Sequence, residues 1–215
     1  MKKIGLIDYY LDNWHASNLP KWLDDETHGE YKICYAWASF SPDGSQIGSG
    51  KECSKPSEVW CAEHNVELVS SAAEVVEKSD VLMVLAPNNP EQHEFLSREA
   101  LASGKPTYID KTFAPDVATA KRIFDMAKAG NTPMFSSSAL RFSSELKNIK
   151  REGICVISSR GPGAYDVYSI HQIEMIVSLM GHDVKQVMAI GNEAAPALAI
   201  EFSGGRFATM GHFGW

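Results

Sequence analysis

The clearest strand pattern in the chain runs from Asp80 to Ala86, where every residue after the aspartate is apolar. A strand without polar positions is covered on both faces, as in a parallel sheet that lies between two layers of helices. Weaker strand patterns occur at Lys2–Ile7, Tyr31–Phe40, Glu67–Val69, Pro106–Ile109 and Thr132–Phe142.

Helical patterns separate these strands, with apolar residues about every three to four positions. They cover Asn13–Leu23, Pro56–Asn65, Ser71–Lys78, Glu91–Ser103 and Pro115–Ala129. Strands that alternate with helices predict an α/β fold with a Rossmann-type doubly wound parallel sheet, and we assign it to residues 1–142. The Gly-, Ser- and Pro-rich stretch Ser41–Ser57 is predicted to be a surface loop.

The pattern changes after Phe142. Helices are predicted at Ser144–Arg151 and Val167–Met180, and strands at Ile154–Ser159, Val184–Ile190 and Ala197–Phe213. Residues 143–215 therefore read as a smaller, abbreviated α+β domain. Its few strands leave an open sheet edge, which predicts a homo-oligomer, at least a dimer, formed through this C-terminal sheet.

Composition places limits on function. With 44% hydrophobic and 22% charged residues, the chain has the composition of a folded globular protein. A net charge of -7, with no basic cluster longer than Lys147–Arg151, argues against a nucleic-acid partner. The four cysteines show no zinc-site spacing, so we expect no metal. The apolar run Ile4–Ile7 is too short for a signal or a membrane span, and we expect a cytoplasmic location without a membrane partner.

Three segments follow predicted strands: Asp8–Asn13, Ala86–Asn89 and Asp110–Thr112. Ligands of open α/β sheets bind at the carboxyl ends of strands, so a parallel sheet would bring these segments together. No glycine follows Gly5 in the first turn, which holds Tyr9, Tyr10 and Leu11. The glycine fingerprint of dinucleotide sites is therefore missing, and on the fingerprint alone the case for NAD is weak.

Lys111 and His171 are the two candidate catalytic residues. Lys111, at a strand end beside Asp110, could donate a proton or bind a substrate hydroxyl, or it could be a surface lysine paired with Asp110. His171 shares a helical face with Glu174, which suits acid-base work, although a packed histidine held by Glu174 or a backbone carbonyl fits the same pattern. Arg141 could bind an anion or form a structural ion pair.

The order of several motifs resembles the Gfo/Idh/MocA family, which is named for glucose-fructose oxidoreductase and inositol dehydrogenase. The motifs are Ala86-Pro87-Asn88 with His93, Gly104-Lys105-Pro106 leading to Asp110-Lys111, Ala139-Leu140-Arg141-Phe142, and Ile170-His171-Gln172-Ile173-Glu174. The resemblance implies a Rossmann domain followed by an α/β domain whose open sheet serves sugar binding and oligomerisation.

The resemblance also implies residue roles. Asp110-Lys111-Thr112 stands for the family's Glu-Lys-Pro, so Lys111 would bind the substrate hydroxyl, and His171 with Glu174 would be the acid-base group. Arg141 would contact substrate. The nucleotide, NAD or NADP, would lie against Gly5, Asp8, Tyr10, Ala86, Pro87, Asn88, His93, Asp110 and Lys111.

Val167 departs from the family pattern, because the helix motif has an Asp four residues before its histidine. The nearby Asp166 would be turned about 140° away from the His171 face. The leading hypothesis is an NAD(P)-dependent oxidoreductase acting on a sugar or polyol. Two alternatives are a non-catalytic ligand-binding or regulatory protein, and an enzyme like the family's NAD-dependent glycosidases.

Overall fold

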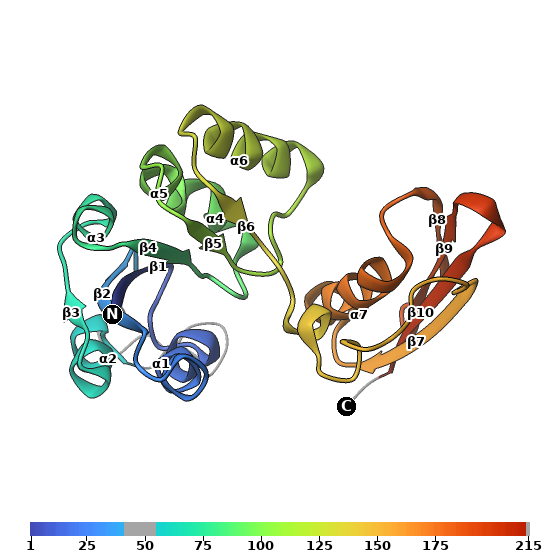
Figure 1. Cartoon of the computed structure of the whole chain (residues 1–215), viewed down its shortest axis with the longest axis horizontal. Coiled ribbons are helices and arrows are strands. Elements are labelled where there is room, and N and C mark those ends of the chain that lie inside the picture. The colour runs from blue at the N-terminus through green and yellow to red at the C-terminus, as the bar shows by residue number, and fades with distance from the viewer. Residues whose placement is uncertain (41–54, 214–215) are drawn as a thin grey trace. The chain divides into compact units, whose positions relative to one another are not determined.

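The structure, a computed structural model, describes residues 1–40 and 55–213. Its internal contacts divide the chain into two compact units, Met1–Ser136 and Ser137–Trp215 (Figure 1). Most of the predicted loop Ser41–Ser57 lies outside the described residues. The contacts thus divide the chain a few residues before Phe142, where the sequence pattern had suggested a boundary.

The first unit is built on a six-stranded sheet in which every pairing is parallel. The strand order is β3-β2-β1-β4-β5-β6. From β1 the chain adds β2 and β3 on one side of the sheet and then β4, β5 and β6 on the other, so the strand order reverses between β1 and β4. This is the doubly wound arrangement that the sequence predicted. The strands are β1 (Lys2–Asp8), β2 (Tyr31–Ala38), β3 (Glu67–Leu68), β4 (Val81–Val84), β5 (Thr107–Ile109) and β6 (Met134–Phe135).

Helices cover both faces of this sheet, as Figure 1 shows. Leu6 of β1 packs in one core with Trp60, and the next residue, Ile7, packs in the other with Ile123. Neighbouring strand residues point to opposite faces, so β1 is buried on both sides. One face carries α1 (Trp14–Thr27) and α2 (Ser57–His64), and the other carries α3 (Ala72–Lys78), α4 (His93–Leu96), α5 (Arg98–Ala102) and α6 (Val117–Ala129).

Gly5 lies inside β1, and the structure gives it a packing role. A Cβ atom at this position would stand 2.3 Å from Ser79 Oγ and 2.4 Å from Val75 Cγ1. Only a residue without a side chain lets α3 approach the strand this closely. Gly5 therefore has a role in packing between β1 and α3, and its assignment to the nucleotide stays a prediction.

The predicted helix Glu91–Ser103 is divided into three pieces. A 3₁₀ turn, η1 (Pro90–Gln92), leads into α4, and α4 ends at Ser97, where α5 begins. Ser97 has a ψ angle of -7° at this junction, while its N–H still bonds to the His93 carbonyl at 3.0 Å and its carbonyl accepts the Leu101 N–H at 2.8 Å. Apolar periodicity continues through such a break, so the pattern could not reveal it.

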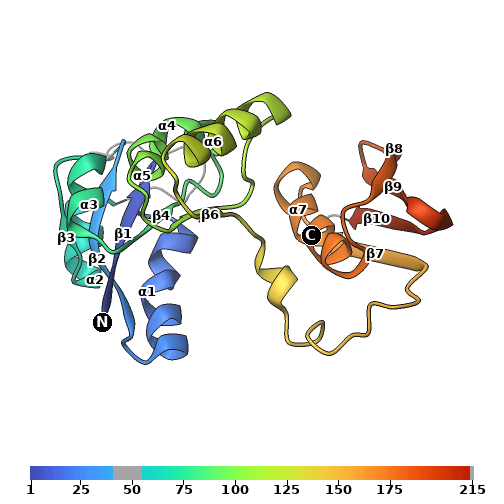
Figure 2. The same cartoon turned by 45° about the horizontal axis from the view of Figure 1, so that its top comes forward.

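The second unit is a mixed four-stranded sheet in the order β7-β10-β9-β8, with α7 packed against β7 and β10 (Figure 2). Strand β10 pairs parallel to β7 and antiparallel to β9. Ile176 of α7 packs in one core with Ile200, Phe202 and Met210 of the sheet. The elements are β7 (Val156–Pro162), α7 (Tyr165–Met180), β8 (Val184–Asn192), β9 (Ala195–Phe202) and β10 (Phe207–Phe213).

Three predicted elements of the C-terminal half were wrong in extent or type. Ser144–Arg151 forms isolated turns, because its residues bury no apolar face that would stabilise a helix. The predicted strand Thr132–Phe142 is only β6, followed by the 3₁₀ helix η2 (Ala139–Phe142). The predicted strand Ala197–Phe213 is two strands joined by η3 (Ser203–Gly205), where Gly204 and Gly205 have φ angles of 74° and 75°.

No helix among the described residues is both long and apolar enough to cross a bilayer. The cytoplasmic location stays a prediction.

Candidate functional site

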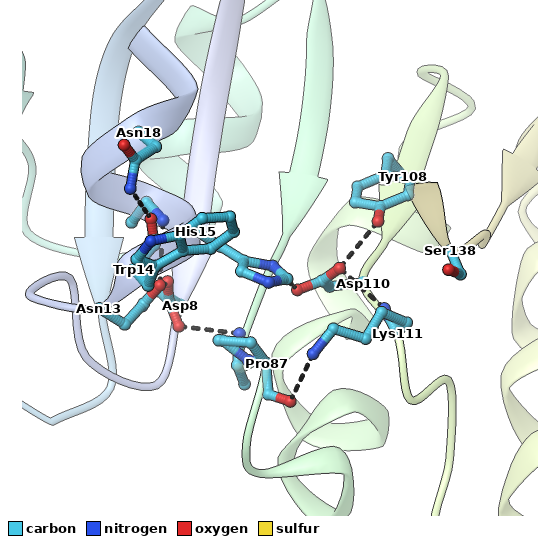
Figure 3. A network of polar contacts seen from close by, with 12 residues as sticks. Asp8, Asn13, Trp14, His15, Asn18, Pro87, Tyr108, Asp110, Lys111 and Ser138 are labelled. Atoms are coloured by element: carbon cyan, nitrogen blue, oxygen red, sulfur yellow. Dashed lines mark hydrogen bonds and ion pairs between the residues drawn. The ribbon is translucent and has the colours of Figure 1, made fainter. Parts of the chain in front are cut away.

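The turn after β1 is held by side chains in place of glycines. Asn13 Nδ2 donates to Asp8 Oδ2 at 2.9 Å and to the carbonyl of Tyr10 at 2.8 Å (Figure 3). Its Oδ1 accepts the Ala16 N–H at 2.9 Å, so Asn13 is also the N-cap of α1. One asparagine therefore fixes the strand end, the turn and the start of the helix.

Asp8 joins this turn to the end of β4. Its Oδ1 accepts the backbone N–H of Tyr9 at 2.7 Å and that of Ala86 at 2.9 Å. Ala86 has a φ of 75°, a left-handed conformation that costs a residue with a Cβ about 1 kcal/mol or more. The bond to Asp8 helps to hold Ala86 in that conformation, and the turn closes with the Asn89 N–H on the Ala86 carbonyl.

The Asp8 carboxyl is completely buried. Burial raises its pKa to about 7, with a smaller contribution from the charge of Asp110, while the hydrogen bonds from Asn13, Tyr9 and Ala86 oppose the rise. A carboxyl group with a pKa in this range is in part protonated near neutral pH. Tyr10, also assigned to the nucleotide, is buried at the same turn.

Asp110, at the end of β5, is 1% exposed and collects donors from two elements. His15 Nδ1 lies 2.5 Å from its Oδ2, and the Tyr108 hydroxyl donates to Oδ1 at 2.8 Å. Burial works to raise the pKa of Asp110, but the hydrogen bond and charge of His15, the Tyr108 hydroxyl and the charge of Lys111 outweigh it and lower the pKa. An ionised carboxylate only accepts, so the proton between the two groups sits on His15 Nδ1.

Lys111 is buried, at 8% exposure, and is not a solvated surface lysine. Its backbone N–H donates to Asp110 Oδ1 at 2.8 Å, and its Nζ lies 3.5 Å from the Pro87 carbonyl oxygen. The lysine thus reaches from the end of β5 to the turn after β4, as Figure 3 shows. The three strand-end segments converge as the sequence predicted.

His93 begins α4 and is fully buried. Its Nδ1 lies 3.0 Å from the carbonyl oxygen of Phe113. Burial lowers the pKa of His93, so the ring is neutral at physiological pH. The contact ties α4 to the chain just after Lys111, which gives His93 a supporting position behind the strand ends.

His171 lies in the second unit, on α7. Its Nδ1 is 2.6 Å from Ser138 Oγ, and its ring lies beside that of Tyr168, with centroids 5.8 Å apart. Ser138 also accepts the Leu140 N–H and so begins η2. The serine orients the imidazole with respect to the start of η2, a contact that the sequence interpretation had given to Glu174 or a backbone carbonyl.

Glu174 and Arg141 form an ion pair in the same unit. Arg141 Nε lies 3.1 Å from Glu174 Oε2, which also accepts the Ser137 hydroxyl at 3.1 Å. This is the structural ion pair that the sequence left open for Arg141. Val167 is half-buried on α7 and Asp166 is exposed. His171, Glu174 and Arg141 thus gather where η2 meets α7.

Sequence reasoning missed His15, Asn13 and Ser138. Asn13 is an N-cap residue, and His15 follows it by two positions, so both lie where a helix starts at the carboxyl edge of β1. That placement was a usable signal. Ser138 ends a run of three serines, Ser136–Ser138, which carries no pattern of its own.

Within residues 1–40 and 55–213, no three His, Cys, Asp or Glu side chains gather closely enough to hold a metal ion.

A family model described as an oxidoreductase family with an NAD-binding Rossmann fold, the Gfo/Idh/MocA model, matches residues 40–136. The uncharacterised oxidoreductase YhhX of Escherichia coli K12 is 25% identical over 167 residues, which are 66% of this chain and 48% of that protein. The chain spans about half the length of this curated relative.

Solved structures share the fold at low sequence identity. An NAD-binding protein from Listeria innocua superposes with a TM-score of 0.75 and 15% identity, covering 99% of this chain and 67% of the other. The UDP-N-acetylglucosamine 3-dehydrogenase GnnA from Acidithiobacillus ferrooxidans has a TM-score of 0.73 and 12% identity, covering 98% and 68%. At identities this low, the structural similarity shows a common fold and nothing beyond it.

Proposed function

We propose that the chain supports NAD(P)-dependent oxidation or reduction of a sugar or polyol, because residues 40–136 match the model of the Gfo/Idh/MocA oxidoreductases with their NAD-binding Rossmann fold. The observation that carries the proposal is the convergence at the β1/β4 reversal, where buried Lys111 reaches the Pro87 carbonyl and Asp8 binds Ala86. Such a reversal point is where doubly wound sheets bind nucleotides.

The residues at this point fit a dinucleotide in their chemistry. Asn88 and Lys111 bring an amide and an ammonium group to the strand ends, and α1 begins there with its N-terminus. Asp8, Tyr10, Ala86, Pro87, Asn88, His93, Asp110 and Lys111 are the residues that we propose to surround the nucleotide. When bound, the nicotinamide supplies a site that accepts or gives a hydride.

The chain's own residues then have to manage the hydroxyl proton. We assign Lys111 to binding the substrate hydroxyl, because a buried ammonium next to a carboxylate presents donors in a fixed direction. We assign His171 to proton transfer, because an imidazole can take up or release a proton near neutral pH and the contact of Nδ1 with Ser138 Oγ, at 2.6 Å, fixes the orientation of this ring. Glu174 and Arg141 support this region, with Arg141 as a candidate contact to substrate.

Nucleotide binding tests the first part of the proposal. Fluorescence titrations of the purified chain with NADH and NADPH should show binding of at least one nucleotide. The ratio of the two dissociation constants will decide between NAD and NADP. Failure of both to bind would end the proposal. Lys121→Met, on the exposed face of α6, is the matched control for Lys111→Met.

A polyol and sugar panel tests the second part. We expect Lys111→Met and His171→Asn each to lower turnover by about 100-fold or more, while Lys121→Met leaves it unchanged. Asparagine keeps a group near the position of Nδ1, so the Ser138 contact survives while acid-base capacity is lost. Full turnover in His171→Asn would remove His171 from the mechanism.

The turn at Asp8 favours a second candidate function. A buried carboxylate that already occupies the Tyr9 and Ala86 N–H groups stands where dinucleotide enzymes have glycine. A ligand-binding or regulatory protein without redox turnover would tolerate this arrangement. Binding of NADH with no turnover on any polyol would support that alternative.

We also propose self-association through the sheet of the second unit. On the face opposite α7, strand register places Phe207 of β10 beside Val156 of β7, and Met188 and Ile190 lie on β8 at the other edge of the same sheet. These side chains are 41–53% exposed. Light scattering should give at least the mass of a dimer, and Phe207→Glu should reduce it to one chain. A wild-type mass of a single chain would end this proposal.

A further inference from the structure

We infer that His15 is a positioning residue for Lys111 and acts on it through the carboxylate of Asp110. The value of this arrangement for catalysis rests on the proposed function, whereas its effect on the lysine does not. In Figure 3 the Asp110 carboxylate lies between the His15 ring and the Lys111 backbone.

The position of His15 is fixed by the start of α1. Asn13 caps this helix by accepting the Ala16 N–H, and His15 lies in the first turn, directed towards β5. Its side chain is 22% exposed, whereas that of Asp110 is 2% exposed. The imidazole therefore separates a buried carboxylate from solvent.

Both carboxylate oxygens of Asp110 have donors. His15 Nδ1 occupies Oδ2, and the Tyr108 hydroxyl and the Lys111 N–H occupy Oδ1. Turning the carboxylate would break all three bonds, so the histidine and the tyrosine together hold the acceptor that fixes the Lys111 peptide. A well-held peptide limits where the lysine side chain can reach.

Charges from several elements act at this point. Asp110 faces His15 from α1 and Tyr108 and Lys111 from its own segment, and its charge also acts on Asp8 at β1 and on His93 in α4. The carboxylate favours the ammonium form of Lys111, while the N–H of His15 withdraws part of that negative charge. Loss of His15 and loss of the Asp110 charge should therefore move the protonation of Lys111 in opposite directions.

The test reads the lysine directly and needs neither nucleotide nor substrate. Lysines are labelled with ¹³C at Cε, the Lys111 resonance is identified by its absence in Lys111→Arg, and its titration is followed by NMR up to about pH 11. In His15→Leu we expect the midpoint to rise by about 0.5–1 pH unit, and in Asp110→Asn to fall by about 1 unit or more.

His15→Asn distinguishes the effect of the hydrogen bond to Asp110 from that of the imidazole ring. Its amide keeps a donor near the position of Nδ1, so its midpoint should lie closer to wild type than that of His15→Leu. If instead the contact of His15 with the Trp14 ring, at 5.4 Å between centroids, were responsible, Asn and Leu would behave alike. The resonance of exposed Lys121 is the internal control and should not move.

Three results would overturn the inference: equal midpoints in wild type and the His15 variants, shifts of one sign in His15→Leu and Asp110→Asn, or a Lys111 resonance that keeps its ammonium position in all of them. If Asp110→Asn does not fold, the two His15 variants still decide the matter. A protein that shows the expected shifts but binds no NADH or NADPH would support this inference and contradict the proposed function.

Discussion

The side-chain amide of Asn13 lies 2.9 Å from the carboxylate of Asp8 and donates a hydrogen bond to it. The same amide nitrogen reaches the Tyr10 carbonyl, so the turn between β1 and α1 is closed by one side chain. A glycine-rich turn reaches a tight shape through backbone freedom, whereas this turn reaches it through three hydrogen bonds of one residue. The stability of the first unit should therefore depend strongly on Asn13.

We expect Asn13→Ala to lower the free energy of unfolding by about 2–3 kcal/mol, because it removes a helix cap and the hydrogen bond that Oδ2 of the buried Asp8 carboxylate accepts. Urea unfolding followed by circular dichroism measures the loss. Ser71→Ala is the matched control, because Ser71 also caps a helix, by accepting the Glu74 N–H at the start of α3, while Asn13 in addition bonds to the buried Asp8. It should cost about 1 kcal/mol. Equal losses would contradict the role of Asn13 in the turn.

Asp8 predicts a pH dependence of stability with a definite sign. Its pKa is about 7 in the folded chain, against an ordinary value of 3.8, so between these values the folded state binds more protons than the unfolded state. Stability from this group is then highest below about pH 4 and is lost as the pH rises to about 7.

We compare Asp8→Asn with wild type to isolate this effect from other titrating groups. The difference in unfolding free energy should move in favour of the variant by about 2–3 kcal/mol between pH 5 and pH 8. Urea titrations at both pH values measure it. A difference that is independent of pH would show that Asp8 is already ionised at pH 5.

Gly5 gives a steric prediction. Gly5→Ala would press a methyl group against Ser79 and Val75, and we expect a loss of about 2–3 kcal/mol in thermal or urea unfolding. Gly211→Ala is the control, because a Cβ there would meet its nearest neighbours at 3.8 Å, an ordinary contact distance. A variant Gly5→Ala that is as stable as Gly211→Ala would mean that α3 can move away from β1 at little cost.

Lys105 caps the end of α3 from a distance in sequence. Its Nζ donates to the carbonyl oxygens of Val76 at 2.5 Å and Ser79 at 2.7 Å. We expect Lys105→Met to destabilise the chain by about 1–2 kcal/mol, because these carbonyls lose a charged donor. Lys121→Met on α6 should change the melting temperature little, and a similar effect of both substitutions would argue against the cap.

The sequence pattern predicted the first unit well because apolar strand segments alternate with amphipathic helical segments along residues 1–136. Val81–Val84 shows why, since burial on both faces leaves no polar residue in the strand. The pattern failed at Ser144–Arg151, where a helix-like sequence has no surface to pack on, and at Ser203–Gly205, where two glycines turn one apolar run into two strands. Tertiary packing decides both cases.

In the candidate site, too, the sequence predicted the positions of residues along the chain but not their partners in space. Asp110 and Lys111 could be placed from the sequence because they end a strand, and the convergence of three loops followed from parallel topology. The partners of these residues could not be placed. His15 meets Asp110 across 95 positions of chain, and Ser138 meets His171 across 33, and no local pattern records such contacts.

The central place of β10 in the second sheet affects how the unit can be made. β10 pairs with both β7 and β9, although β7 precedes it by about fifty positions in the chain. During synthesis β7, α7, β8 and β9 leave the ribosome first, and β7 and β9 have no strand between them until residues 207–213 emerge. In the first unit the last strand, β6, is only an edge. We therefore expect the first unit to begin folding before the second, whose sheet is complete only when β10 is present.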